Sequence, residues 1–188
     1  FVRVPGETRS NIKLVEADGR VTDINGEGPE VDEAARSALL RRLEQIAPGH
    51  DAVVVAGSLP RGISPEWFRQ LLEQLKAQGL KVALDSSGEA LRAGLQSAPW
   101  LVKPNTEELG EVLGLDVQSP AQQRAAAERL LASGVEHVVV SAGEQGVSWF
   151  ARDLALQAQP PKVQVASTVG AGDSLVAGMV HGLLLGET

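Results

Sequence analysis

Residues 11–25 alternate between apolar and polar side chains, with Ile12 and Ile24 among the apolar positions and Asp18-Gly19 at the centre. Strict alternation is the period of a strand that is buried on one face. The pair Asp-Gly suits the tight type I′ turn that joins two strands of a hairpin. These residues therefore predict a β-hairpin, and its thin apolar face requires another surface to cover it.

From Val31 the period changes, and helical stripes then alternate with short apolar runs. Two of the predicted helices open with a Ser-Pro pair, at Ser64 and Ser119, which supplies an N-cap and a favourable first residue. The continuous run 52–56 is typical of a strand buried on both faces. Strands are predicted at 52–56, 81–84, 100–102 and 137–140, and helices from Val31 through Ile46, from Pro65 to before Gly79, over 106–113 and from Pro120 to before Gly134.

Strands that alternate with helices over short connections predict a doubly wound α/β fold, a mostly parallel sheet flanked by helices. Ligands of such sheets gather at the carboxyl ends of the strands. The segments that follow the four predicted strands are all small, polar or charged: Gly57-Ser58, Asp85-Ser86, Lys103-Pro104-Asn105 and Ser141-Ala142-Gly143.

The segment 163–186 contains a single carboxylate, Asp173, directly after Gly170-Ala171-Gly172, and it is apolar at nearly every later step through Leu185. The pattern predicts a buried helix. One interpretation makes Asp173 the cap of this helix and the glycines a turn. The other makes the glycine run an anion hole of backbone N–H groups at the helix end, with Asp173 as a base beside it.

Two other glycine motifs that bind nucleotides do not match the sequence. A dinucleotide-binding G-x-G-x-x-G that starts at Gly170 would need glycine where Leu175 stands, and the Gly-Lys-Ser of a phosphate-binding P-loop is absent. Hydride transfer and P-loop chemistry therefore lose support.

The composition narrows the class of protein further. The chain of 188 residues has a net charge of −7, three Trp, three Phe and no Tyr, so nucleic acid is an unfavourable partner. A chain of this length can form one hydrophobic core and fits one domain, or one and a half. No apolar run is long enough to span a bilayer, and the lack of cysteine excludes disulfides, thiolate metal sites and a cysteine nucleophile. A cytoplasmic enzyme is expected.

Four segments resemble the ribokinase-like sugar kinases, in their phosphofructokinase B branch, and they follow the family's order along almost the whole chain. The run Ser167 to Val180 resembles the specific carboxyl-terminal motif of the family. The others are Thr8-Arg9-Ser10-Asn11, the run from Gly57 to Gly62, and the run from Lys103 to Glu108.

The resemblance implies a role for each candidate residue. Asp173 is the expected catalytic base, and Gly170, Ala171 and Gly172 supply the anion hole. Asn105 and Glu108 are expected to organise Mg²⁺ near the phosphates of ATP, since hard oxygen ligands suit this ion. Further expected ligands are Lys103, Asn105, Ser141, Gly143 and Gly146 for the nucleotide, and Arg9, Ser58 and Asp85 for the phosphosugar.

The residues by themselves leave plainer interpretations open. Asn105 three residues before Glu108 is also the pattern of a helix capping box. Gly143 to Gly146 is consistent with a hairpin turn, and Lys103 with a solvated lysine. An isolated arginine such as Arg9 is usually surface.

Family members are substantially longer than this chain. The resemblance therefore implies a fragment: residues 1–30 form part of a β lid, and residues 31–188 form an incomplete kinase core without the family's upstream glycine-rich segment and final helices. The lid often builds a dimer interface in the family, so a homodimer is expected for the complete protein. The isolated chain is expected to associate and to have little activity.

The function that the resemblance implies is ATP-dependent phosphorylation of a ketohexose phosphate, fructose 1-phosphate to fructose 1,6-bisphosphate. An arginine such as Arg9 suits a sugar that carries a phosphate dianion. Fructose 6-phosphate and tagatose 6-phosphate remain alternative substrates, and a non-catalytic nucleotide-binding regulatory module remains the alternative of another class.

Overall fold

The computed structural model describes residues 1–16, 20–161 and 169–187. The chain divides into two compact units, one of Phe1–Pro48 with Leu59–Ser64, and one of Gly49–Ser58 with Pro65 to the carboxyl end. They are called unit 1 and unit 2. The predicted division into a partial lid, 1–30, and a core, 31–188, remains a prediction.

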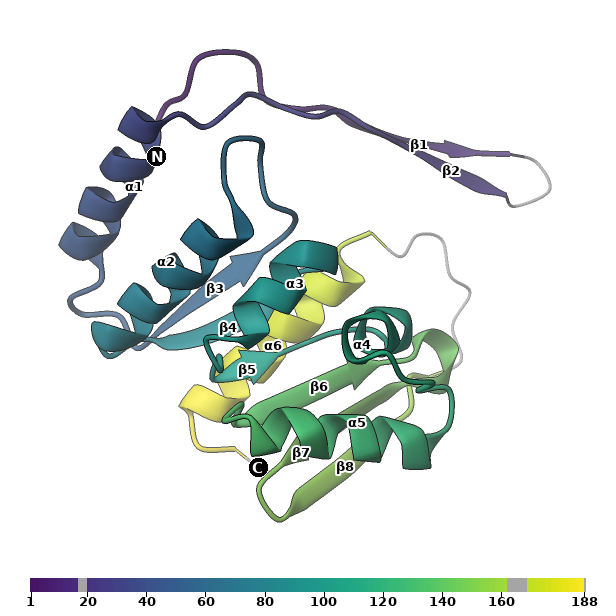
Figure 1. Cartoon of the computed structure of the whole chain (residues 1–188). Helices are drawn as coiled ribbons and strands as arrows, with labels where there is room; N and C mark the ends of the chain where they lie inside the picture. The colour runs from purple at the N-terminus through teal and green to yellow at the C-terminus, as the bar shows by residue number, and fades with distance from the viewer. Residues whose placement is uncertain (17–19, 162–168, 188) are drawn as a thin grey trace. The chain divides into compact units, whose positions relative to one another are not determined.

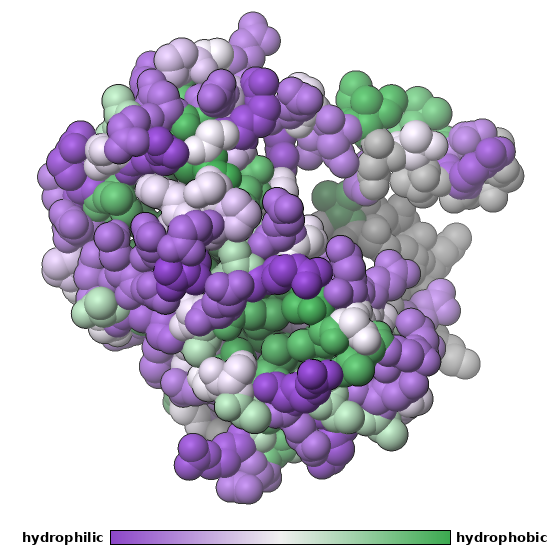
Figure 2. Space-filling model, in the orientation of Figure 1, coloured by the Kyte–Doolittle hydropathy of each residue, from purple (hydrophilic) through white to green (hydrophobic). Residues whose placement is uncertain are grey.

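Unit 1 contains the predicted hairpin. Strand β1 (Asn11–Val15) pairs antiparallel with β2 (Val21–Asn25), and Ile12 lies opposite Ile24. The predicted turn at Asp18-Gly19 lies outside the described residues. Apolar side chains of this hairpin are exposed and form a green patch in Figure 2.

Unit 1 also contains α1 (Glu33–Ile46), where the sequence predicts a helix from Val31. The side chain of Asp32 caps this helix by accepting a hydrogen bond from the Ala35 N–H at 2.8 Å. The segment 59–64 is tied to the rest of unit 1 by the backbone N–H of Val31, which donates to the Arg61 carbonyl at 2.9 Å, and by the Arg61 guanidinium, which donates to the Gly28 carbonyl at 2.8 Å.

Unit 2 is built on a six-stranded sheet in the order β3-β4-β5-β6-β7-β8. Neighbours from β3 to β6 are parallel, and β7 and β8 continue the sheet antiparallel. The mostly parallel sheet flanked by helices is confirmed. The strands are β3 (Ala52–Ala56), β4 (Lys81–Asp85), β5 (Leu101–Val102), β6 (His137–Ser141), β7 (Val147–Ala151) and β8 (Leu154–Ala158).

Helices cover both faces of this sheet (Figure 1). Leu84 of β4 faces Leu72 and Gly94 from two helices on one side, whereas its neighbour Ala83 packs with Val176 and Val180 of the last helix on the other. Gly94 allows this close packing, because a Cβ there would lie 2.4 Å from Leu84 Cδ2. The helices are α2 (Pro65–Ala77), α3 (Gly88–Leu95), α4 (Thr106–Leu113), α5 (Pro120–Ala132) and α6 (Ala171–Leu184).

Two predictions about burial are wrong. The run 52–56 is not buried on both faces, because Val54 is 47% exposed. Here β3 is the edge strand, and α6 packs over Ala83, Leu101 and Val139 of the strands beyond it. Nor is α6 buried throughout: Val176 and Val180 are its buried residues, and Leu185 just after it is 64% exposed.

Candidate active site

The carboxyl ends of β3 to β6 form one edge of the sheet in unit 2, which is called the carboxyl edge. Backbone hydrogen bonds hold the segments after the strands in register there. The Gly57 N–H donates to the Asp85 carbonyl at 2.9 Å, the Lys103 N–H donates to the Leu84 carbonyl at 3.1 Å, and the Ser141 N–H donates to the Pro104 carbonyl at 3.1 Å. The candidate residues that follow these strands therefore share one rigid edge, as the topology of a parallel sheet requires.

Lys103 and Asp85 form an ion pair at this edge. Lys103 Nζ lies 3.0 Å from Asp85 Oδ1, and the two side chains are 9% and 17% exposed. Leu84 of β4 is in register with Val102 of β5. Asp85 and Lys103, which follow these two residues, therefore lie side by side. Lys103 is thus a buried, paired cation, which rules out the interpretation as a solvated lysine.

The first turn of α6 lies against this pair. Gly170 is the N-cap with φ of 79°, in the left-handed region that glycine adopts at little cost, and no side chain in the described part of the chain caps the helix. A Cβ on Gly172 would lie 3.4 Å from Lys103 Nζ and 4.0 Å from Asp85 Oδ2. The structure thus places the glycine run, a buried ammonium and the positive end of a helix together, which is an arrangement suited to an anion.

Asp173 is the third residue of α6 and is exposed. Because Gly170 is the N-cap, Asp173 does not cap the helix, and that part of the plain interpretation is wrong; the turn that it predicted is present at Val169-Gly170. Its carboxylate stands in the first turn, beside the donors of the glycine run. A carboxylate in that place is accessible to a hydroxyl group that is brought to the same end of the helix.

Asn105 and Glu108 form a capping box at the start of α4. The Asn105 side chain accepts a hydrogen bond from the Glu108 N–H, and Glu108 Oε2 accepts one from the Asn105 N–H, both at 2.8 Å. The plain interpretation is therefore confirmed, and a metal role stays a prediction.

The oxygens of this box fit a magnesium ion that keeps its water shell. Both side chains are half-buried and carry hard oxygen ligands, and the bond from the Asn105 N–H uses one of the two Glu108 carboxylate oxygens. No cluster of three or more His, Cys, Asp or Glu able to hold a metal occurs within residues 1–16, 20–161 and 169–187. Mg²⁺ typically needs only one or two carboxylates, since waters and substrate phosphates complete its shell.

Ser141 ends β6, and Gly143 and Gly146 lie in the connection from β6 to β7. A short 3₁₀ turn, η1 (Gly143–Gln145), closes with a bond from the Gly146 N–H to the Gly143 carbonyl at 3.1 Å. A Cβ on Gly146 would lie 2.1 Å from the Ala158 carbonyl oxygen, so this position has no room for a side chain. The hairpin-turn interpretation is correct, and the contact with nucleotide stays a prediction.

The residues expected on the phosphosugar side are divided between the two units. Arg9 belongs to unit 1, whereas Ser58 and Asp85 belong to unit 2. Arg9 and Ser58 are both exposed, and Ser58 follows β3 at the carboxyl edge. The structure therefore groups Ser58 and Asp85 with the site at this edge.

Sequence reasoning missed one buried group beside the site. Ser86 follows Asp85, is 5% exposed, and its Oγ has no hydrogen-bond partner among the described residues. The sequence places this polar residue after an apolar strand, but it does not show that the hydroxyl is buried.

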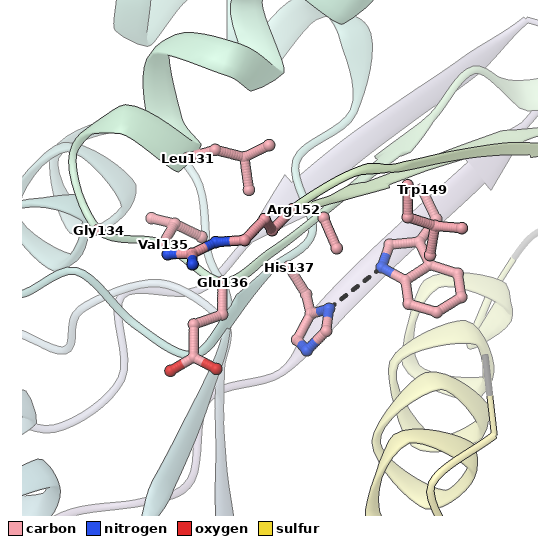
Figure 3. Close-up of a pocket in the computed structure, with 9 residues that line it drawn as sticks. Leu131, Gly134, Val135, Glu136, His137, Trp149 and Arg152 are labelled. Atoms are coloured by element: carbon pink, nitrogen blue, oxygen red, sulfur yellow. Dashed lines mark hydrogen bonds between the residues drawn. The ribbon is translucent and has the colours of Figure 1, made fainter.

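A hollow of about 720 Å³ lies at the opposite end of β6 from Ser141 (Figure 3). His137 and Trp149 line it, and Trp149 Nε1 donates a hydrogen bond to His137 Nδ1 at 3.3 Å. Burial lowers the pKa of His137; Glu136 opposes this shift and Lys81 adds to it. Because it lies away from the carboxyl edge, we do not assign this hollow to the site.

Comparison with known proteins defines the class to which this fold and site belong. The model of the pfkB family of carbohydrate kinases matches residues 1–188, and the chain belongs to that family. ATP is the co-substrate of carbohydrate kinases of this family, and a divalent cation is typical of them.

Among curated relatives, the chain is 47% identical over 182 residues to 1-phosphofructokinase from Vibrio cholerae, covering 97% of this chain and 57% of that protein. It is 44% identical over 188 residues to 1-phosphofructokinase from Escherichia coli, covering 100% and 60%. The solved structure of phosphofructokinase-2 from Escherichia coli in complex with fructose-6-phosphate superimposes with a TM-score of 0.83 at 33% identity, over 95% of this chain and 59% of that one. The chain thus spans less than two thirds of the length of these relatives.

Within the described part of the chain, no helix is both long and apolar enough to cross a membrane.

Proposed function

We propose that the protein transfers the terminal phosphoryl group of ATP to the free primary hydroxyl of a ketohexose phosphate, converting fructose 1-phosphate to fructose 1,6-bisphosphate. The observation that carries this proposal is the cluster at the carboxyl edge. It joins the buried ammonium of Lys103, the uncapped start of α6 at Gly170, and the exposed carboxylate of Asp173. The names of the relatives favour fructose 1-phosphate as the acceptor.

In this proposal Asp173 is the general base. Its carboxylate accepts the proton of the sugar hydroxyl as the hydroxyl oxygen forms a bond to the terminal phosphorus of ATP and the bond to the bridging oxygen of ADP breaks. The N–H groups of the run Gly170-Ala171-Gly172 and the positive end of α6 stabilise the charge on the transferring phosphoryl oxygens. Lys103 contributes a nearby positive charge, and its side chain is largely shielded from solvent.

Asn105 and Glu108 would hold Mg²⁺ through their oxygens and its water molecules, near the phosphates of ATP. When bound, this ion neutralises phosphate charge. Ser141, Gly143 and Gly146 are proposed to contact the nucleotide, since their turn follows β6 at the same edge. On the acceptor side, we propose Ser58 and Asp85 for sugar hydroxyls or the metal shell, and Arg9 for the phosphate dianion.

Fructose 6-phosphate and tagatose 6-phosphate are the alternative acceptors, and phosphofructokinase-2, which was solved with fructose-6-phosphate, supports the first of them. A nucleotide-binding regulatory module without catalysis is the alternative of another class. The cluster around Asp173 favours an enzyme over this module, because a module that only binds does not need a base.

The deciding experiment measures ATP consumption coupled to loss of each of the three phosphosugars. We would compare this chain with a polypeptide that is extended at both ends to the length of its relatives. The expected result is selective turnover of fructose 1-phosphate by the extended polypeptide alone. Magnesium-dependent ATP binding without turnover of any sugar would favour the regulatory module.

Asp173→Asn is the matching variant. It should lower kcat by about 10² to 10⁴ while ATP binding is retained, since one positioned base contributes about this much. Glu89→Gln is the control, because Glu89 is also an exposed carboxylate in the first turn of a helix, α3. Equal effects of the two variants would contradict a base at Asp173.

We also propose a homodimer formed through the hairpin of unit 1 in the complete protein, and a cytoplasmic location. One solved neighbour is described as the tetrameric inhibited form of phosphofructokinase-2 from Escherichia coli, so association occurs in that protein. The exposed apolar face of β1 and β2 supports the dimer, and the absence of cysteine is consistent with a reducing compartment.

A further inference from the structure

The pair of Asp85 and Lys103 is the least exposed ion pair among the described residues, at 17% and 9% of the side chains. The other described pairs include at least one partner that is 40% exposed or more. Taking an ammonium out of water is unfavourable unless a counter-charge compensates it. Asp85 supplies that counter-charge to Lys103 in this structure.

The carboxylate of Asp85 lies at a position that would also suit a phosphate group. One oxygen, Oδ1, lies 3.0 Å from Lys103 Nζ, and the other, Oδ2, lies 4.0 Å from where a Cβ of Gly172 would be. Gly172 belongs to the first turn of α6, where the helix dipole favours negative charge. Two features that attract an anion thus converge on a carboxylate of the chain itself.

We propose that Asp85 is a positioning residue that acts through Lys103. Its carboxylate serves as a placeholder anion: it fixes the ammonium beside α6 in the free protein, and it shares the ammonium with a phosphate group of the nucleotide once that group arrives. This inference rests on the proposed function, and for Asp85 it replaces the contact with sugar hydroxyls that was proposed there, so Ser58 alone keeps that role.

Gly172 contributes to the same arrangement of Asp85, Lys103 and the first turn of α6. Because a Cβ there would lie 3.4 Å from Lys103 Nζ, at the near limit of van der Waals contact, a side chain would fill the space between helix and ammonium. That space is where a phosphate oxygen must approach both the Lys103 charge and the helix N–H groups. A glycine keeps it open.

The kinetic test is a double-mutant cycle with Asp85→Asn, Lys103→Met and both changes together, in the full-length polypeptide. We expect Asp85→Asn to lower kcat about tenfold or more, since coupled neighbours interact at this level, and to leave the KM for the sugar within about twofold. The double variant should be close to Lys103→Met alone. Additive effects, or a sugar KM that rises while kcat is retained, would overturn the proposal.

The second test does not depend on turnover and uses inorganic pyrophosphate as the probe. In phosphate-free buffer at constant ionic strength, Asp85→Asn should have a lower Tm than the unchanged protein, because Lys103 is left buried without a counter-charge. Pyrophosphate should restore most of this loss by replacing the missing anion, and it should raise the Tm of the unchanged protein less. Equal shifts in both proteins would refute the placeholder role.

A matched control removes an ion pair elsewhere. Glu66→Gln breaks the pair with Arg69 on the surface of α2, at 2.7 Å, and pyrophosphate should not change its effect. Should Asp85→Asn fail to fold, Lys103→Met replaces the ammonium by a neutral group of similar length and should lose the response to pyrophosphate; a retained response would overturn the proposal. If no phosphosugar is turned over by any protein, the proposed function fails, and the pyrophosphate shifts still decide the role of Asp85.

Discussion

At the scale of single residues, one ion pair, that of Lys103 with Asp85, arranges the buried charge at the carboxyl edge. Lys103 and Asp85 each follow an apolar run, and the rule for parallel sheets places both at the carboxyl edge. Their ion pair depends on β4 and β5 being neighbours in register, and the sequence alone does not state strand order. The unpartnered Ser86 hydroxyl was likewise invisible, because hydrogen bonding in the interior is a property of the packed structure.

Ser86→Ala should leave the free energy of unfolding unchanged or raise it, since an unsatisfied buried hydroxyl costs about 1 to 3 kcal/mol. Ser97→Ala is the matched control: Ser97 is also 5% exposed, but its Oγ donates to the Gly94 carbonyl at 2.7 Å. That variant should lose about 1 kcal/mol. Urea unfolding of both variants checks the contrast, and a clear loss in Ser86→Ala would mean that its hydroxyl has a partner in solution.

His137 should make stability depend on pH. Burial lowers its pKa in the folded protein, so below about 6.5 the unfolded chain binds more protons than the folded chain. The stabilising contribution is complete above about pH 6.5 and is lost as pH falls through the lower folded pKa. Urea unfolding between pH 5 and 8 should show this slope. His137→Gln should flatten it, and an unchanged slope would assign the effect to other groups.

At the scale of helices and strands, local signals predicted the elements that carry them. Pro65, Asn105 and Ser119 begin or cap α2, α4 and α5 as expected, since a cap is a contact within a few residues. Helix α3 was missed, because it has eight residues and two of them are glycines. Strands β7 and β8 were missed because their runs are short and mixed, and pairing with β6 stabilises them.

The two capping boxes provide a test that separates structure from chemistry at Asn105. Asn105→Ala and Ser119→Ala each remove an N-cap, so each should lower the free energy of unfolding by about 1 kcal/mol. Only Asn105→Ala should also raise the magnesium concentration needed for half-maximal turnover. Thermal unfolding and magnesium titrations of both variants measure this. The same magnesium dependence in both would leave Asn105 as a cap alone.

At the scale of the whole molecule, the sequence predicted the α/β class and an additional hairpin whose apolar face requires another surface to cover it. The α/β sheet and the hairpin are present in the structure, and apolar side chains of the hairpin are exposed. The assignment of α1 and of residues 59–64 to unit 1 was not predicted. It depends on contacts between distant segments, such as those of Arg61 with Gly28 and Val31, which no local pattern announces.

Self-association should depend on the hairpin. Ile24 is 54% exposed on β2, opposite Ile12. Ile24→Thr should weaken the dimer about tenfold, the order expected when one half-buried aliphatic side chain is lost from an interface. Leu156→Thr on β8 is the control, because Leu156 is 47% exposed in unit 2. Sedimentation at several protein concentrations compares them, and equal weakening would place the interface elsewhere.

The cluster of Trp100, His137 and Trp149 has an optical consequence. Trp100 precedes β5 at the amino end of the strand, and its ring meets that of His137 edge to face with centroids 5.3 Å apart. With Trp149 bonded to the same imidazole, two of the three indoles in the chain lie around one titrating group and away from the carboxyl edge. Their emission should follow the charge of His137 and respond little to nucleotide, so a dye or an indole introduced beside α6 would report binding more directly than these two.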